Sequence, residues 1–364
     1  MKTVGLYSPY IPKHAGGGER YLLSIAEVCS QYHSTYLLVP ADLVVETQRA
    51  LPRYSKMFGL DLSAVKVKAS LIGISKSPIT TVKETQAFHY LFAMTDGSIF
   101  PTLCRNSYLI MQVPWKRPLK VTERAKLISW KKILVYSDFV AKVLSQSWHV
   151  RKLEVLAPYV DHKDFVAGKK EKLIVTTGRF FAHSQSNSKH QDVLIQAFIK
   201  WIDQDHPKGW HFAVVGNVDP NPDSHDYVSK LKELSRGYPI SLHLNVSFDE
   251  LRAFYARAQF YWHAAGFNVD EKKHPENTEH FGITTVEAMA SGAIPIVVPK
   301  GGQVEVVGDP QLYWNSPQEL VDAMRKLVKQ SSAQRDDLLE KLLLQSKRYS
   351  KENFERSLKK LLNL

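Results

Sequence analysis

The segment that decides the fold of this chain is Glu279-His280-Phe281-Gly282-Ile283-Thr284-Thr285-Val286-Glu287, which runs on through small residues into an apolar stretch ending at Val298. This pattern predicts a loop with one carboxylate, a glycine turn, a short helix from Ile283 with a second carboxylate, and a buried strand over 294–298. The N–H groups at the start of that helix suit phosphate, and carboxylates accept hydrogen bonds from sugar hydroxyls. The segment therefore predicts a site for an anionic, polyhydroxylated ligand, with a capped surface helix and two solvated glutamates as the alternative.

The composition indicates a soluble globular protein of two domains. The chain has 364 residues, of which 44% are hydrophobic and 23% are charged, and a single core seldom serves more than about 250–300 residues. No apolar run reaches the roughly 20 residues that a membrane-spanning helix needs. The apolar part of residues 1–10 is too short for a secretory signal and predicts a first strand, so we expect a cytoplasmic location.

The charge balance predicts an anionic partner. The chain carries 48 basic and 36 acidic side chains, which gives a formal net charge of +12. Such a charge attracts nucleic acid, membrane surfaces and phosphorylated substrates alike. The two cysteines, Cys29 and Cys104, are too few for a disulfide framework and have too few neighbouring ligands for a metal site, so we expect both to be small buried residues.

A glycine-rich turn follows the first predicted strand. After the strand over 3–8 come Gly16-Gly17-Gly18 and a helical pattern over 21–31. Strand, glycine turn and helix is the order in which a backbone closes on a phosphate, although a flexible turn also fits the triple glycine. Strand and helix patterns then alternate through 35–39, 65–69, 87–94 and 97–100, with strands over 108–112 and 133–136, a helix over 137–146 and a last strand over 155–161.

Two further features of the N-terminal half are candidates for contacts with a ligand or a membrane. Gln112 ends a strand just before Pro114, where parallel sheets place ligand contacts, although a glutamine there also suits a loop. The segment 116–132 holds seven basic residues and one acidic residue, Glu123, with Trp115 and Trp130 at its flanks. A solvated helix face is the simplest interpretation of this segment, and a contact with a membrane surface or lipid phosphate is the alternative.

The second half restarts the alternation after a charged stretch over 168–172 that suggests a linker. A strand over 173–176 leads into Gly178-Arg179, a Ser-rich loop over 183–189 and a helix over 191–201. Arg179 and Lys189 bracket that loop, which places two cations at the mouth of one strand, as a diphosphate needs. Later strands are predicted over 212–217, 240–246, 260–263 and 294–298, and helices over 248–258, 317–329, 333–345 and 351–362.

Taken together, these motifs resemble the retaining GT-B glycosyltransferases of family 4, and the resemblance covers nearly the whole chain. The block from Glu279 to Glu287 is its most specific carrier. The other carriers are Gly16-Gly17-Gly18, Gly178-Arg179, the run Lys189–Phe198, Val215-Gly216 and the run Pro299–Glu305. The resemblance implies an α/β fold of two Rossmann-like parallel-sheet domains facing across a cleft, with an acceptor domain over 1–165, a nucleotide-sugar domain over 170–345 and a final helix over 350–364 that crosses back to the first domain.

The resemblance also implies roles for individual residues. Glu287 would hold the ribose hydroxyls, and Glu279 would face the donor sugar and the reacting centre. Arg179 and Lys189 would neutralise the diphosphate, which leaves with developing negative charge. The backbone that meets the sugar hydroxyls and phosphates would come from Phe281, Gly282, Ile283, Thr284 and Thr285, while Gly17 and Gly18 would let the first domain approach the phosphates.

One position departs from the family pattern. Many members carry a histidine before the proline at the end of the strand that corresponds to 108–112, and the nearest match here is Gln112. A glutamine binds a hydroxyl but does not titrate, which leaves an acid or base role at this position unsupported. His14 or His263 would be the replacements, and both also fit structural histidines. The base for the acceptor stays unassigned.

The function that the resemblance implies is a metal-independent, retaining transfer of a hexose from a UDP-sugar, UDP-glucose first, to a glycan or lipid-linked glycan in polysaccharide or glycolipid assembly. We expect no cofactor and no metal, because the one Asp-x-Asp sequence, Asp203-Gln204-Asp205, follows a predicted helix instead of a strand. We expect peripheral contact with an anionic membrane and none with nucleic acid, for which no motif is present. The alternatives are a nucleotide-sugar-binding subunit without catalysis and a basic nucleic-acid-binding protein.

Overall fold

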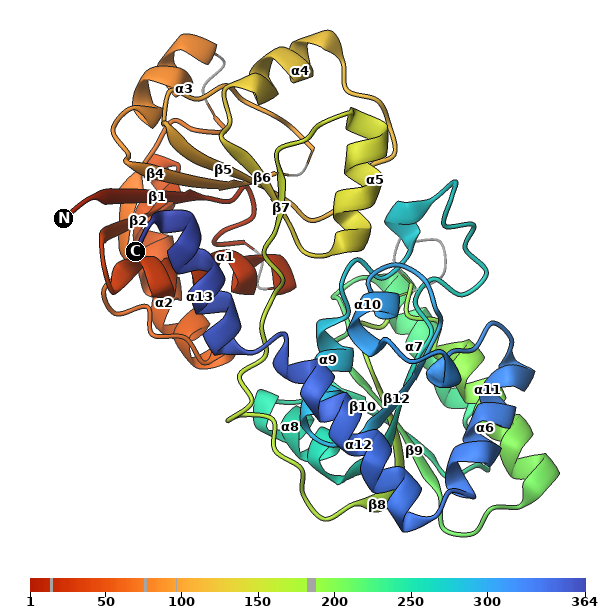
Figure 1. The fold of residues 1–364 in the computed structure, drawn as a ribbon. Coiled ribbons are helices and arrows are strands. Elements are labelled where there is room, and N and C mark those ends of the chain that lie inside the picture. Colours follow the sequence, from red (N-terminus) through yellow and green to blue (C-terminus); the bar gives the residue numbers. More distant parts are fainter. Residues whose placement is uncertain (14–15, 75–76, 96, 182–187) are drawn as a thin grey trace. The chain divides into compact units, whose positions relative to one another are not determined.

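The computed structural model describes residues 1–13, 16–74, 77–95, 97–181 and 188–364, which form two compact units (Figure 1). The first unit comprises Met1–Ala157 and Glu355–Leu364, and the second comprises Pro158–Phe354. The stretch 168–172 is not a linker, because it packs within the second unit. Lys170 donates to the backbone carbonyl of Ser291 over 2.5 Å, and burial lowers the pKa of its ammonium group to about 8.

The first unit is built on seven parallel strands in the order β3-β2-β1-β4-β5-β6-β7. Every residue of β4, Tyr-Leu-Phe-Ala-Met, is buried, as expected for a parallel strand covered on both faces. The strands are β1 (Thr3–Tyr7), β2 (Ser34–Val39), β3 (Lys66–Ala69), β4 (Tyr90–Met94), β5 (Asn106–Met111), β6 (Lys132–Val135) and β7 (Leu153–Val155). The helices are α1 (Gly17–Ser30), α2 (Val44–Phe58), α3 (Pro78–Thr85), α4 (Val121–Ile128) and α5 (Asp138–Trp148), with a 3₁₀ turn η1 (Ala41–Leu43).

Two predicted strands of this unit are wrong. Residues 97–100 form no strand, because Gly97 adopts a φ of +110° and Pro101, which has no N–H to donate to a ladder, follows directly. The last strand lies over Leu153–Val155 instead of 155–161. The ladder with β6 stops there because Pro158, which has no N–H to donate, lies just beyond it.

The second unit is built on five parallel strands in the order β10-β9-β8-β11-β12. Helix α6 packs against α11, and α9 packs against α12. The strands are β8 (Glu171–Thr177), β9 (His211–Gly216), β10 (Ile240–Leu244), β11 (Ala258–His263) and β12 (Ile294–Val297). The helices are α6 (Gln191–Asp205), α7 (Pro222–Leu234), α8 (Phe248–Arg257), α9 (Ile283–Ala290), α10 (Gln303–Val307), α11 (Pro317–Val328) and α12 (Ser332–Lys347), with 3₁₀ turns η2 (Pro275–Asn277) and η3 (Pro310–Leu312).

Both sheets have the Rossmann order, which confirms the predicted fold class. In each sheet the strand order reverses at one place, between β1 and β4 and between β8 and β11. Ligands of such sheets bind outside the carboxyl ends of the strands at this reversal. The sheet topology therefore directs attention to the loops that follow β8 and β11.

The final helix α13 (Lys351–Leu362) carries the chain back into the first unit, to which Glu355–Leu364 belong. Leu358 and Leu362 are fully buried. Tyr108 donates its hydroxyl to the carbonyl of Leu361 over 2.7 Å, and Tyr90 donates to the carbonyl of Leu362. Buried leucines and two tyrosine hydrogen bonds therefore hold this end of the helix in the first unit.

The structure also shows the state of the two cysteines and the character of the helices. Cys29 and Cys104 are unpaired and buried, as predicted. Burial raises the pKa of both thiols, that of Cys104 to about 11, so neither forms a reactive thiolate near neutral pH. Over the described ranges, every helix is too short or too polar to cross a bilayer.

Candidate functional site

The loop and helix that carry Glu279 and Glu287 have the predicted form. Helix α9 begins at Ile283, directly after Gly282, which adopts a left-handed conformation with φ +104°. A Cβ atom at Gly282 would lie 2.8 Å from Nε2 of Gln303. Both the backbone conformation and the close approach of Gln303 require glycine at this turn.

A pair of glycines, Gly301 and Gly302, packs against the loop that carries Glu279. The N–H of Gly302 donates to the carbonyl of Glu279 over 2.7 Å. A Cβ at Gly301 would lie 2.0 Å from that carbonyl oxygen, and one at Gly302 would lie 2.5 Å from Cα of Phe281. The block over 299–305 therefore fixes the Glu279 loop by backbone contact.

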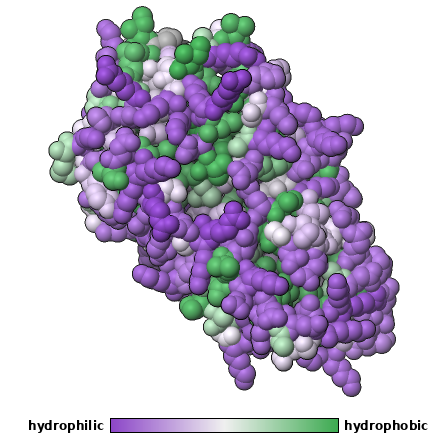
Figure 2. Space-filling model, in the orientation of Figure 1, coloured by the Kyte–Doolittle hydropathy of each residue, from purple (hydrophilic) through white to green (hydrophobic). Residues whose placement is uncertain are grey.

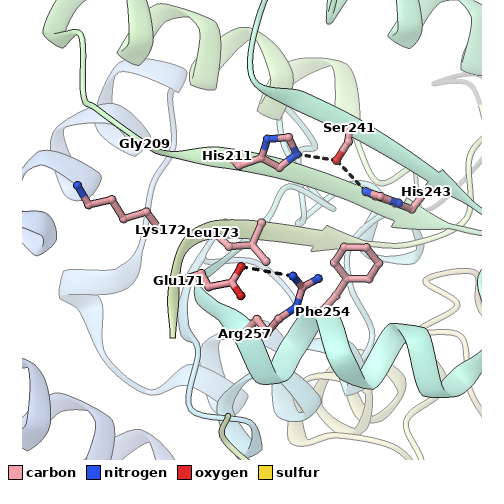
Figure 3. A pocket seen from close by; sticks show the side chains of 9 residues that line it. All are labelled: Glu171, Lys172, Leu173, Gly209, His211, Ser241, His243, Phe254 and Arg257. Atoms are coloured by element: carbon pink, nitrogen blue, oxygen red, sulfur yellow. Dashed lines mark hydrogen bonds and ion pairs between the residues drawn. The ribbon is translucent and has the colours of Figure 1, made fainter. Parts of the chain in front are cut away.

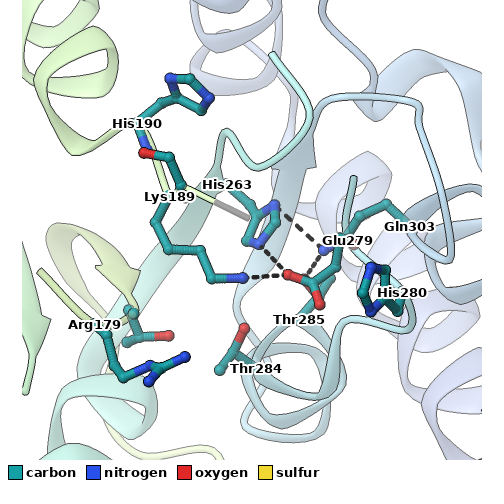
Figure 4. Close-up of polar contacts among 12 residues, drawn as sticks. Arg179, Lys189, His190, His263, Glu279, His280, Thr284, Thr285 and Gln303 are labelled. Carbon is teal, nitrogen blue, oxygen red and sulfur yellow. Dashed lines mark hydrogen bonds and ion pairs between the residues drawn. The ribbon is translucent and has the colours of Figure 1, made fainter. Parts of the chain in front are cut away.

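The Glu279 carboxylate lies between a cation and an imidazole (Figure 4). Its Oε2 is 2.5 Å from Nζ of Lys189 and 3.2 Å from Nε2 of His263. Burial alone would raise the pKa of this carboxyl, but the charge of Lys189 and the hydrogen bond from His263 outweigh burial and hold the pKa well below its usual range. Glu279 is therefore an anion at neutral pH, with 18% of its side chain still exposed to a ligand.

His263 is the last residue of β11, at the carboxyl end of the strand, and it is held from behind. Nε2 of Gln303 lies 3.3 Å from Nδ1 of His263 and 2.9 Å from Oγ1 of Thr285. Because an amide N–H donates to Nδ1, the ring proton lies on Nε2 and points at Glu279. Burial, reinforced by Lys189, lowers the pKa of His263 and keeps the ring neutral. The sequence identified His263 only as a possible replacement for a family histidine and missed Gln303.

Two glycines, Gly178 and Gly216, make room for close packing around the side chain of Lys189. A Cβ at Gly178 would lie 2.7 Å from Cγ of Lys189, and one at Gly216 would lie 1.9 Å from the carbonyl oxygen of Gly178. The two strand-end glycines therefore let the β8 and β9 loops and the lysine stem pack together. Most of the predicted Ser-rich loop, residues 182–187, lies outside the described residues.

Arg179, the other predicted cation, is more exposed. Its Nη1 lies 3.9 Å from Oδ2 of Asp219, and its guanidinium lies 5.4 Å from the centre of the Phe181 ring. The side chain is 65% exposed. Figure 4 shows it after β8, on the same part of the unit as Lys189 and Thr284. The loop after β8 thus carries both cations, each beside a carboxylate.

Glu287 belongs to a buried network of hydroxyl groups. Tyr255 donates to Oε2 of Glu287 over 3.2 Å, and its hydroxyl also lies 2.7 Å from Oγ1 of Thr177. A second phenol, Tyr261, donates to Oγ1 of Thr284 over 2.8 Å. Burial raises the pKa of both tyrosines, so they stay protonated and donate. The sequence did not identify these tyrosines, because they come from α8 and β11 and meet Glu287 only in the fold.

The predicted residues of the first unit lie together. A Cβ at Gly18 would lie 2.7 Å from Nε2 of Gln112, so the glycine makes room for the glutamine. Gly17, by contrast, has open space around it. Helix α1 starts at Gly17, four residues before the predicted helix, because the Glu19 side chain accepts from the N–H of Gly16 over 2.7 Å and caps it. His14 lies outside the described residues. A role for Gly17, Gly18 or Gln112 toward a donor stays a prediction.

The Asp-x-Asp sequence is engaged in ion pairs and hydrogen bonds. Asp205 accepts from Arg325 over 2.7 Å, and Asp203 accepts from the hydroxyl of Tyr238 over 3.0 Å. The pair ends α6 on the surface, as the sequence indicated. Within residues 1–13, 16–74, 77–95, 97–181 and 188–364, no group of three or more His, Cys, Asp or Glu side chains is arranged to hold a metal ion.

A separate cavity of about 310 Å³ opens where β8 and β9 begin, at the other end of the strands from Glu279 (Figure 3). Oγ of Ser241 lies 2.7 Å from Nε2 of both His211 and His243. Arg257 on its wall pairs with Glu171 over 3.3 Å. The polar groups of this cavity thus bind one another, and it does not share residues with the Glu279 site.

Solved structures of similar fold span the whole chain. HepE from Anabaena, in complex with UDP and glucose, has a TM-score of 0.68 at 15% identity and covers 100% of this chain and 99% of its own. Sucrose-phosphate synthase from Thermosynechococcus elongatus has a TM-score of 0.67 at 14% identity, with 100% and 98% covered. A trehalose-6-phosphate synthase, studied for glycosyl transfer with retention, has a TM-score of 0.65 at 10% identity, with 99% of each chain covered. At these identities the likeness establishes the two-domain GT-B fold.

The family follows from the sequence. No curated protein sequence matches the chain. A model of the family described as glycosyl transferases group 1 matches residues 160–342, just over half of the 364 residues. This match spans the second unit from its first residues to α12, and includes Lys189, Glu279 and Glu287. The chain that holds these residues at the carboxyl ends of a parallel sheet therefore belongs to the group 1 glycosyl transferases and is a glycosyltransferase enzyme.

Proposed function

We propose that this protein transfers a hexose, glucose in the first place, from a UDP-sugar to a glycan or lipid-linked glycan, with retention of configuration and without a metal ion. The observation that carries the proposal is the grouping of Glu279, Lys189, His263 and the start of α9 at the reversal of strand order in the second sheet. A similar fold binds UDP and glucose in HepE, and the trehalose-6-phosphate synthase of similar fold acts with retention. Both likenesses support the proposal.

The donor would lie along the loop and first turn of α9. Glu287 would accept hydrogen bonds from the ribose hydroxyls, with Tyr255 holding one of its oxygens. Glu279 would accept from hydroxyls of the transferred sugar. The backbone from Phe281 to Thr285 would offer N–H groups at the helix start to the sugar and phosphates. An anionic carboxylate beside the sugar also stabilises the positive charge that develops on it during transfer.

Lys189 and Arg179 would stabilise the departing diphosphate. Both cations already lie beside carboxylates, Glu279 and Asp219, and a bound diphosphate would add a second anion to each. Preorganised donors of this kind commonly contribute about 10²–10³ in rate each. Two cations and a helix start supply the positive charge that a metal ion supplies in other transferases, so transfer is expected to persist in EDTA. Loss of transfer in EDTA that magnesium or manganese restores would refute the metal-free part.

The first experiment is thermal stabilisation by a panel of nucleotide sugars, with UDP-glucose included. A ligand at about 100 times its Kd adds about 2.7 kcal/mol to the free energy of unfolding. We expect UDP-sugars to stabilise the protein more than GDP- or ADP-sugars. The best donor is then incubated with glycan acceptors, and the anomeric configuration of the product is read by NMR. An inverted product contradicts retention, and the absence of stabilisation by any UDP-sugar contradicts the donor assignment.

A second candidate function is a nucleotide-sugar-binding subunit without its own catalysis. Gln112, which lies against Gly18 and near the sulfur of Met94, favours it because a glutamine does not titrate. Donor binding without transfer to a broad acceptor panel would support this candidate. Nucleic-acid binding, the remaining alternative, requires retention on heparin above physiological salt together with no affinity for UDP-sugars.

A further inference from the structure

Helix α4 of the first unit turns an apolar stripe away from the core. Val121, Ala125 and Ile128 are four and three residues apart, a spacing that places them on one face of the helix. Val121 is 83% exposed and Ile128 is 80% exposed, while Leu127 packs inward. An eight-residue helix with a buried leucine on one side and exposed branched side chains on the other has an unpartnered apolar face.

Neighbouring loops and helices extend this stripe. Leu103, 51% exposed, lies between the ends of α3 and α4, because its N–H donates to Oγ1 of Thr85 over 2.9 Å and the preceding Thr102 donates to Oγ of Ser129 over 3.0 Å. Ile79 on α3 is 68% exposed. Figure 2 shows hydrophobic side chains standing out over α3 and α4. We call Ile79, Leu103, Val121 and Ile128 the α3–α4 face.

The segment that carries α4 is strongly basic. The segment 116–132 has seven basic residues and only one acidic residue, Glu123. Glu123 is engaged by both guanidinium nitrogens of Arg117 at 2.8 Å and by the N–H of Lys120, so it neutralises only its own partner. Lys120 and Arg124 are exposed on either side of Val121. The apolar stripe of α4 is thus flanked by cations whose segment holds no further carboxylate.

We propose that the α3–α4 face docks on an anionic lipid bilayer. Branched apolar side chains enter the boundary between headgroups and acyl chains, while lysine and arginine extend their charges to lipid phosphates. A cation near an anionic surface strengthens binding about fivefold. An acidic protein would find the same charges, but the branched side chains of Val121 and Ile128 are 83% and 80% exposed beside them, and an apolar side chain next to a cation suits the boundary between lipid headgroups and acyl chains. This inference is independent of the donor assignment, and a docked enzyme would meet lipid-linked acceptors at the membrane surface.

The test is flotation of the full chain with vesicles, without any sugar ligand. Vesicles of phosphatidylcholine alone are compared with vesicles containing about a third phosphatidylglycerol. We expect recovery with the anionic vesicles only, and release on raising the salt, because surface charges are screened. Equal recovery with both vesicle types, or no recovery with either, overturns the proposal. Because no donor is present, this result is separate from the success or failure of the UDP-sugar assay.

Variants then locate the contact. Val121→Asp with Ile128→Asp, and separately Lys120→Glu with Arg124→Glu, are each expected to weaken binding to anionic vesicles more than tenfold. The matched controls lie on other exposed positions of α2 and α12: Val45→Asp with Leu344→Asp, and Arg49→Glu with Lys56→Glu. These controls make the same changes in polarity and net charge and should bind like the parent. Equal losses in the face variants and the controls would refute a specific face, and melting temperatures verify that each variant is folded.

Discussion

At the scale of single residues, the site depends on how Glu279 is kept ionised. Its carboxylate contacts a lysine on one side and a neutral imidazole on the other, and these two contacts overcome the effect of burial on its pKa. A carboxylate with so low a pKa is a poor proton donor at neutral pH. In the proposed reaction it would therefore supply negative charge and accept hydrogen bonds, beside a sugar that would gain positive charge during transfer.

Glu279→Gln tests this use of charge. The amide keeps the size of the side chain but removes the negative charge, so turnover should fall by about 10² or more, in line with the loss of one preorganised electrostatic contact. Donor affinity should change less, because the amide still accepts a hydrogen bond. Steady-state kinetics with UDP-glucose, alongside thermal stabilisation by the same donor, separates the two effects. Glu340→Gln, an exposed glutamate of α12, is the control, and a Glu279→Gln enzyme as active as that control would exclude a role for the charge.

Gln303→Met tests the support behind His263. Gln303 is fully buried, and a methionine of similar length removes the hydrogen bonds to His263 and Thr285 while leaving the volume filled. The unsatisfied buried imidazole nitrogen should lower the free energy of unfolding by about 1–3 kcal/mol. Turnover should also fall, because the imidazole proton is no longer fixed toward Glu279. Urea denaturation and kinetics measure the two effects, and an unchanged protein in both assays would contradict a positioning role.

At the scale of elements, the start of α9 was predictable and its surroundings were not. The order of glycine, apolar and carboxylate residues over 279–287 predicts a helix from Ile283, and the structure has it there. The contact of His263 with Gln303 joins residues 40 positions apart and depends on which strand ends lie side by side. Likewise, the charge run over 116–132 indicated a solvated face or a membrane contact, but not which apolar side chains of α4 are exposed. Local patterns predict elements, whereas contacts between loops follow from the strand order.

The glycine that starts α9 offers a test at this scale. Gly282→Ala places a side chain at φ +104° and 2.8 Å from Gln303, so it should destabilise the protein by about 1–2 kcal/mol from the backbone conformation alone. Gly17→Ala is the matched variant, because Gly17 has open space around it and lies in the first turn of a helix. There alanine should stabilise slightly, by about 0.5–1 kcal/mol. Denaturant midpoints decide, and similar values for both variants would show that the turn at Gly282 tolerates a side chain.

At the scale of the whole molecule, the two Rossmann sheets could be predicted because near-continuous apolar runs alternate with helical patterns along the entire chain. The strands that were placed wrongly, at 97–100 and 155–161, are short runs next to proline or glycine, where propensity gives little guidance. One buried and three half-buried histidines are a further property of the molecule that composition does not reveal. Burial lowers the pKa of His211, His243, His263 and His280.

These histidines predict an acid-sensitive fold. A histidine whose pKa is lowered by folding binds fewer protons in the folded protein than in the unfolded chain. The free energy of unfolding therefore falls as the pH drops through the pKa of histidine in the unfolded chain, which is about 6.5. Carboxylates whose pKa is lowered by folding, such as Glu279, also lose stability in acid, but only once the pH approaches the pKa of a glutamate in the unfolded chain, about 4.3. Between pH 7 and 5.5 the loss of melting temperature should therefore come from histidine. His211→Gln with His243→Gln, whose rings both lie 2.7 Å from the Ser241 hydroxyl, should flatten that slope, while an exposed control, His225→Gln on α7, should leave it unchanged. A melting temperature that is constant over this range in the parent would contradict the assignment.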